Sequence, residues 1–156
     1  MQPLERLYRH NAWANARLLT AALGASPEAL AAGGPGGASI LDRIAHFAET
    51  EDAFSLVFAG TPDWPHPPES IAELATYLME RDERLLAVAA GLSPETAAAT
   101  CFVPWFNREV PVEDCLYQVL HHSNQGRSEA AWELRRAGVD TGDLDYIVWL
   151  LEEGAP

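Results

Sequence analysis

Four long stretches of this chain repeat apolar side chains every three or four residues, and this pattern constrains the fold more than any other feature. The stretches cover residues 3–23, 39–59, 71–91 and 111–137, with glycine- and proline-rich segments between the first three. Each stretch places its apolar residues on one helical face. Four amphipathic helices must bury these faces against one another, so the pattern predicts an all-α fold, a four-helix bundle formed by a single domain over residues 1–156.

Capping signals support these helix ends. Ser39 with Asp42, and Ser70 with Glu73, have the spacing of residues that cap the start of a helix. Gly138 follows the fourth stretch at the place where a glycine commonly ends a helix. The second, third and fourth helices therefore have a terminus indicated by sequence alone.

Two further segments depart from the long helical pattern. Residues 96–112 contain β-branched and aromatic residues on both sides of Asn-Arg-Glu, which predicts a short strand-like or hairpin connection. Pro111 is expected in the first turn of the fourth helix, where proline is tolerated. Residues 142–153 are apolar enough to predict a short C-terminal helix that docks on the bundle.

Composition excludes several classes of function. The net charge is −13, from 23 acidic and 10 basic residues, and every basic residue is arginine. Without lysine the chain has no Schiff-base, pyridoxal or P-loop chemistry. A strongly acidic chain without a basic stripe also disfavours nucleic acid as a partner.

The expected location is cytoplasmic. The chain has two cysteines, Cys101 and Cys115, and no apolar leader in its first residues. No window approaches the run of about 18 apolar residues that crosses a membrane. We therefore expect reduced thiols and no membrane partner, and Cys115 is interpreted as a packing residue rather than a nucleophile.

Three histidines lie beside the apolar stripes rather than within them. At 100° per residue, His10, His46 and His122 are displaced by roughly 110–120° from their stripes. From such positions the side chains can meet in a cleft between helices, and a His46/His122 metal pair is one interpretation. The alternative is three partly exposed histidines without a ligand role.

Two charged residues fall in the middle of apolar faces. Glu51 lies between Phe47 and Phe54 of the second helix, and Arg127 occupies the equivalent place in the fourth. An unpaired buried charge costs several kcal/mol, so we predict a structural ion pair between Glu51 and Arg127. Local helix rotation or access of water is the alternative. Asn11 and Asn15 also intrude on an apolar face, and are expected to bond to backbone or to this polar layer.

Four stretches together resemble the DinB/YfiT family over nearly the whole chain: HNAWANARLL, SILDRIAHFAETEDAF, VPWFNREVPVEDCLYQVLHHSNQGR and DLDYIVWLL. The resemblance implies a four-helix bundle that holds a metal with three histidines. One histidine comes from the second helix and two, four residues apart, come from the fourth. His46 and His122 match the first two positions, but Gly126 stands at the third.

The rest of the implied framework is kept. Arg127 matches the family arginine, and Glu51 matches an acidic residue that commonly follows the first histidine by five positions. Two histidines hold a metal far more weakly than the three protein ligands of a catalytic zinc site. His10 and Glu129 are the candidates for a replacement third ligand; the amide of Gln125 suits a metal less well.

Two functions follow from this interpretation. The first is a metal-dependent S-transferase, isomerase or hydrolase that acts on a small molecule, with zinc or nickel and a low-molecular-weight thiol as cofactors. The alternative is a metal-free small-molecule-binding or dimeric interaction protein that has lost the activity. The resemblance also implies a homodimer. Four aromatic residues are further candidates for a pocket or a partner surface: Trp13, Trp64, Trp105 and Phe106. The alternative is that they pack within loops.

Overall fold

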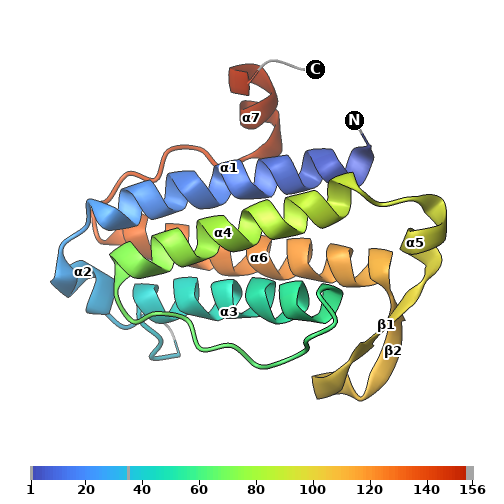
Figure 1. Ribbon diagram of the computed structural model, residues 1–156. Helices are drawn as coiled ribbons and strands as arrows, with labels where there is room; N and C mark the ends of the chain where they lie inside the picture. The colour runs from blue at the N-terminus through green and yellow to red at the C-terminus, as the bar shows by residue number, and fades with distance from the viewer. Residues whose placement is uncertain (1, 35, 154–156) are drawn as a thin grey trace.

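A computed structural model describes residues 2–34 and 36–153. The elements in chain order are α1 (Pro3–Leu23), α2 (Pro27–Ala31), α3 (Ile40–Phe58), α4 (Ile71–Ala90), α5 (Pro94–Ala98), β1 (Thr100–Val103), the 3-10 turn η1 (Pro104–Phe106), β2 (Arg108–Pro111), α6 (Val112–Arg136) and α7 (Tyr146–Glu153). The four long helices α1, α3, α4 and α6 lie side by side (Figure 1). The predicted four-helix bundle, hairpin and C-terminal helix are confirmed.

Each long helix contacts two of the other three most closely. Helix α1 packs on α4 and α6, and α3 packs on the same two helices. The pairs α1/α3 and α4/α6 therefore lie diagonally across the bundle. This arrangement brings α3, with His46 and Glu51, directly against α6, with His122 and Arg127.

The predicted helix ends are close to the observed ones. Ser39 and Asp42 form the expected capping box, in which each side chain accepts a hydrogen bond from the other residue's backbone N–H. Gly138 has a φ of 82°, the left-handed conformation that glycine adopts easily after a helix. The expectation for Pro111 was wrong: it is the last residue of β2, paired with Thr100, and helix α6 begins one residue later.

Two short helices were not predicted. Helices α2 and α5 each span five residues, with Ser26 or Ser93 as the cap and a proline at the start. Five residues cannot display a helical repeat of apolar positions, although the Ser-Pro pairs were a visible local signal. Strands β1 and β2 follow α5 and form an antiparallel hairpin in which Val103 pairs with Arg108.

A layer of polar side chains divides the buried core in two. One apolar cluster lies toward α2 and includes Leu18, Ile44, Phe47, Leu78 and Leu134. The other lies toward the hairpin and includes Tyr8, Phe54, Leu85, Leu116 and Val119. Between them along the helices lie six buried polar residues that are joined in one hydrogen-bond network: Asn11, Asn15, Glu51, Asp82, Ser123 and Arg127.

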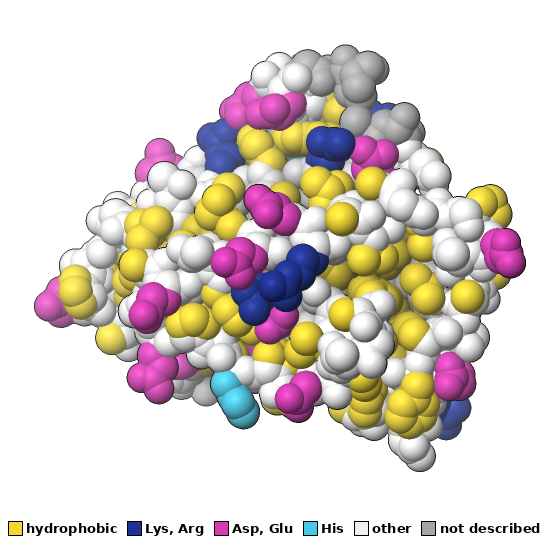
Figure 2. All heavy atoms as spheres, viewed as in Figure 1, with side chains coloured by type: hydrophobic (Ala, Val, Ile, Leu, Met, Phe, Trp, Pro, Cys, Tyr) yellow, Lys and Arg dark blue, Asp and Glu magenta, His cyan; other side chains and the backbone are white. Residues whose placement is uncertain are grey.

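Helix α7 lies on the outer side of α1 (Figure 1), where Trp149 is buried while Ile147 and Leu151 are exposed. Within residues 2–34 and 36–153, none of the helices combines the length and apolar character needed to cross a bilayer. Acidic side chains outnumber basic ones on the face shown in Figure 2.

Candidate functional site

His46 and His122 face each other across the contact between α3 and α6. Their ring centroids are 4.9 Å apart and the rings meet edge to face at 73°. The His46 side chain is 63% exposed, whereas His122 is half-buried. The structure therefore brings together the two histidines that match family ligand positions, at a place that solvent reaches.

The His122 ring has a polar atom without a partner. Its Nε2 atom is buried and makes no hydrogen bond. Burial lowers the pKa of His122, and the neighbouring His46 lowers it further, while Glu129 acts in the opposite direction. The imidazole is consequently neutral at neutral pH, the form that binds metals or exchanges hydrogen bonds with a ligand.

The surroundings of His46 connect this pair to an aromatic cluster. His46 Nδ1 lies 3.8 Å from Glu49 Oε2, and Glu49 Oε1 accepts a hydrogen bond of 2.9 Å from the Trp64 indole. The Trp64 ring stands edge to face on Trp105 at 5.3 Å, and Trp105 contacts Phe106 at 6.2 Å. Three of the four aromatic residues singled out in the sequence thus form one cluster near the histidine pair.

The fourth aromatic residue lies in a different environment. Trp13 contacts the His10 ring at 5.8 Å, and the Arg17 guanidinium lies 4.8 Å from the centre of the Trp13 ring. These residues belong to α1 on the side that faces α7. The His10 ring in turn contacts Tyr146 and Trp149 of α7, so Trp13 belongs to this aromatic group rather than to the wall beside His46.

The position of the implied third ligand is closed by Phe47. A Cβ built on Gly126 would lie 2.9 Å from both Cβ and Cδ1 of Phe47, closer than such atoms approach in proteins. Phe47 is completely buried, so its ring has little room to move away. Gly126 is thus a site of close contact between α3 and α6, and any side chain there requires the helices to separate.

Glu51 and Arg127 are both buried, as the sequence predicted, but they do not form the predicted direct ion pair. Arg127 Nη1 donates hydrogen bonds of 2.8 Å to the side-chain oxygens of Asn11 and Asn15. The amide nitrogens of the same two asparagines donate to Glu51 Oε1 at 3.1 and 3.2 Å. Ser123 adds a 2.6 Å bond to that oxygen. No direct ion pair forms because the two amides lie between the charged groups and make hydrogen bonds to both.

Asp82 is a member of this layer that the sequence analysis missed. Its carboxylate accepts hydrogen bonds from Asn11 and Asn15 at 3.1 Å. The signal was present, because residue 82 lies on the third apolar stripe between Leu78 and Leu85. Burial raises the pKa of Asp82 well above its ordinary value, and the charge of Glu51 raises it further. Asp82 therefore binds a proton more readily than an exposed aspartate does, and burial raises the pKa of Glu51 as well.

The sequence profile of the DinB superfamily matches residues 10–130. This chain belongs to the DinB superfamily. Its structure resembles YfiT from Bacillus subtilis, with a TM-score of 0.70 and 16% identity, over 90% of this chain and 91% of that one. It also resembles a DinB-like protein from Bacillus cereus, with a TM-score of 0.66 and 19% identity, over 87% and 91% of the respective chains. No curated protein matches the chain significantly in sequence.

YfiT is described as a probable metal-dependent hydrolase with an unusual four-helix bundle topology. In this DinB-superfamily protein, both candidates for a replacement third ligand are engaged by other groups, although Glu129 is near enough to raise the pKa of His122. The His10 ring nitrogen is 2.9 Å from the Leu144 carbonyl, and Glu129 forms a 2.6 Å ion pair with Arg43. Across the described parts of the chain, no group of three or more His, Cys, Asp or Glu side chains is arranged to hold a metal. A three-ligand centre does not fit these residues.

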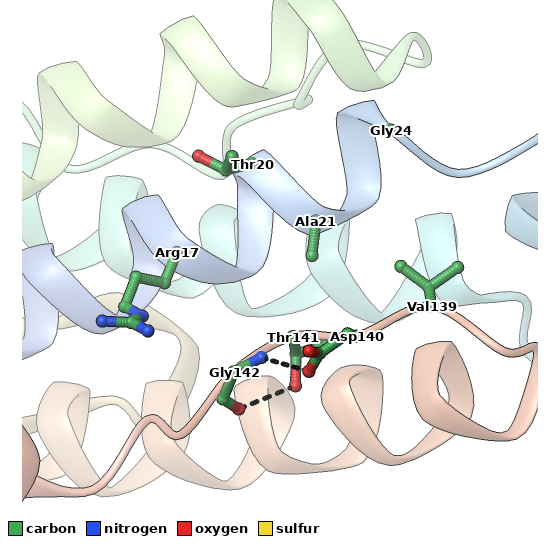
Figure 3. A pocket seen from close by; sticks show the side chains of 8 residues that line it. All are labelled: Arg17, Thr20, Ala21, Gly24, Val139, Asp140, Thr141 and Gly142. Atoms are coloured by element: carbon green, nitrogen blue, oxygen red, sulfur yellow. Dashed lines mark hydrogen bonds between the residues drawn. The ribbon is translucent and has the colours of Figure 1, made fainter.

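A separate groove of about 530 Å³ lies between α1 and residues 139–142 (Figure 3). The Gly142 N–H donates to Asp140 at 2.8 Å, which shapes one wall. Arg17 lines the other wall, but it also forms a 2.6 Å ion pair with Glu152 of α7. This groove of the DinB fold offers neither histidine nor cysteine, so the His46–His122 pair is the stronger candidate site.

Proposed function

We propose that this DinB-superfamily protein binds a small molecule at the His46–His122 pair without a tightly held metal. One observation carries the proposal: Phe47 fills the space that a side chain at Gly126 would need. The third ligand of the implied centre is thus replaced by apolar packing, while His46 stays exposed and the His122 ring lies half-buried beside it. A pair of imidazoles at an exposed helix junction can still bind a ligand through hydrogen bonds.

The surroundings indicate an uncharged or cationic ligand with a flat apolar part. His122 is neutral at neutral pH, Glu49 lies beside His46, and the chain carries a net charge of −13. Each of these features disfavours an anion. The Trp64 indole, 44% exposed, offers an aromatic face to a flat or cationic group.

A fragment titration followed by NMR tests this proposal. Benzylamine, benzamide and benzoate share one ring and differ in charge, so they form a matched series. We expect the first two to shift the signals of the His122 ring and the Trp64 indole, and benzoate to leave them unchanged. The shifts should disappear in His122→Ala and persist in His121→Ala, an exposed neighbour. Equal responses to all three fragments would contradict the proposal.

A second candidate function is the metal-dependent one, and the unpartnered Nε2 of His122 favours it. In that case His46 and His122 would hold zinc or nickel, and a low-molecular-weight thiol would be the co-substrate of a hydrolase or transferase. Metal supplied to these residues would act as a Lewis acid toward the small molecule.

Metal titration separates the two candidates. Stripped protein is titrated with zinc and with nickel against a chromogenic chelator, in the wild type, His46→Ala, His122→Ala and the control His121→Ala. Under our proposal the dissociation constant is about 1 μM or weaker, because two histidines provide only part of a site. Tight stoichiometric binding that both ligand variants abolish would favour the metal-dependent function instead. The homodimer implied by the family resemblance is a separate proposal, which light scattering measures directly.

A further inference from the structure

The two cysteines, 14 residues apart in sequence, lie in contact with each other. The sulfur atoms of Cys101 and Cys115 are 3.6 Å apart, and both thiols are free. Cys101 belongs to β1, and Cys115 lies in the first turns of α6. The contact therefore connects the hairpin to the helix that carries His122.

The two thiols differ in access to solvent. Cys115 is only 2% exposed, whereas Cys101 is half-buried and lines a surface groove of about 470 Å³. Most of the groove is apolar, with walls from α3, α4, the residues that follow α4, and β1; these walls include Val57, Phe58, Val88 and Leu92. Apolar side chains gather at this end of the bundle in Figure 2. A small neutral oxidant can thus reach Cys101 first, with Cys115 directly behind it.

We propose that Cys101 and Cys115 form a reversible disulfide when the protein meets a peroxide. The Cys101 sulfur attacks one peroxide oxygen, the O–O bond breaks, and one water leaves with the thiol proton, giving a sulfenic acid. The Cys115 sulfur then attacks the Cys101 sulfur and displaces hydroxide, which takes up the Cys115 proton to form a second water. Two thiols and one hydrogen peroxide become one disulfide and two waters. A low-molecular-weight thiol reverses the reaction by exchange.

The required movement is small. A disulfide bond is about 2.0 Å long, so the sulfurs must approach by roughly 1.6 Å from their present distance. Cys101 also donates a weak 3.7 Å hydrogen bond to the Val110 carbonyl across the hairpin, and rotation of its side chain gives up only this contact. The disulfide would close a loop that contains the whole β1–β2 hairpin.

The surroundings also predict a pH dependence of the rate. Burial raises the pKa of Cys115 to about 12, and the neighbouring Cys101 contributes to the rise. The charge of Asp114, the preceding residue of α6, adds to the same effect. Because the thiolate is the reactive form, closure of the disulfide is slow at pH 7 and faster at pH 9.

Oxidation of the purified full chain tests this inference. The reduced protein is treated with hydrogen peroxide, quenched with an alkylating reagent and weighed by mass spectrometry. We expect a product that has lost two hydrogens, takes up no alkyl group and regains two alkylation sites after reduction. The thermal midpoint of the oxidised form should rise by roughly 5–10 °C, as expected for closing a loop of this size.

The single variants Cys101→Ser and Cys115→Ala complete the test. Each should remain a single chain without a disulfide that keeps one alkylatable thiol or gains oxygen, without the loss of two hydrogens. Wild-type protein in which both thiols remain alkylatable after peroxide, or in which each gains oxygen independently, would overturn the inference. So would a disulfide found between molecules rather than within one. None of these outcomes depends on whether the histidine pair binds a ligand.

Discussion

Phe47 of α3 lies against the Cα atom of Gly126 of α6, so closely that a Cβ at residue 126 would be 2.9 Å from two of its atoms. The family resemblance implies a histidine at residue 126. In this chain the missing ligand and the buried aromatic ring belong to one packing arrangement between two helices. The loss of the third ligand is therefore a change in how α3 and α6 pack, in addition to a change of one side chain.

The first prediction concerns Gly126→Ala. In a helix interior this substitution ordinarily stabilises by about 1 kcal/mol. Here the overpacking against Phe47 should outweigh the gain, and we expect the free energy of unfolding to fall by roughly 1–2 kcal/mol. Urea denaturation measures this change in the free energy of unfolding. Gly24→Ala is the matched control, because its nearest neighbour would be an ordinary 3.6 Å away, and its effect should be small. A stabilised Gly126→Ala protein would contradict the packing argument.

The second prediction concerns restoration of the ligand. Gly126→His alone should leave zinc affinity within about tenfold of the wild type, since Phe47 blocks the new side chain. Adding Phe47→Ala removes the ring, although its Cβ remains, and the double variant should bind zinc at least tenfold more tightly than Gly126→His. The zinc affinities are compared by titration, at a temperature where circular dichroism shows that both variants are folded. A tight site in Gly126→His alone would show that the helices separate easily.

The third prediction concerns the buried arginine. Arg127→Met removes the donor to the Asn11 and Asn15 oxygens and leaves Glu51 without a buried positive charge. We expect the free energy of unfolding to fall by about 3–5 kcal/mol, as for other buried networks that lose one charge. Arg136→Met, an exposed position on the same helix, should change it by less than about 0.5 kcal/mol. Equal effects of the two substitutions would contradict the role assigned to the layer.

The fourth prediction concerns pH. The pKa of Asp82 is raised well above its ordinary value in the folded protein, first by burial and then by Glu51. Its contribution to stability is therefore complete below the unfolded pKa of about 3.9 and decreases as pH rises toward the folded pKa. In that window, wild-type protein should lose up to about 1.4 kcal/mol per pH unit relative to Asp82→Asn.

Denaturation from pH 4 to pH 9 measures this difference. Glu83→Gln, on the exposed side of the same helix, is the control and should follow the wild-type curve. The same slope for Asp82→Asn and wild type would mean that the pKa of Asp82 is not raised in the folded protein.

The sequence predicted the fold well because each long helix carries its own apolar stripe. The same stripes identified Glu51 and Arg127 as buried, and placed His46 and His122 toward a common cleft. They did not show what lies between two charges, so the bridging role of Asn11 and Asn15 emerged only from the structure.

Other features depend on distances that no stripe encodes. The contact of Phe47 with Gly126 depends on how closely two helices approach. The contact of Cys101 with Cys115 depends on the register of the hairpin, which residues 96–112 do not specify by themselves. Helices α2 and α5 were missed because five residues are too few for periodicity.

The buried layer also affects how this scaffold tolerates change. Asn11 and Asn15 of α1 each bond to side chains of α3, α4 and α6, so a shift of any one helix by a turn would break several bonds together. The layer therefore sets the register of the four helices from inside the bundle. The exposed histidine pair takes no part in it. Ligands on the outside can therefore be gained or lost over evolutionary time while the helices keep the same alignment.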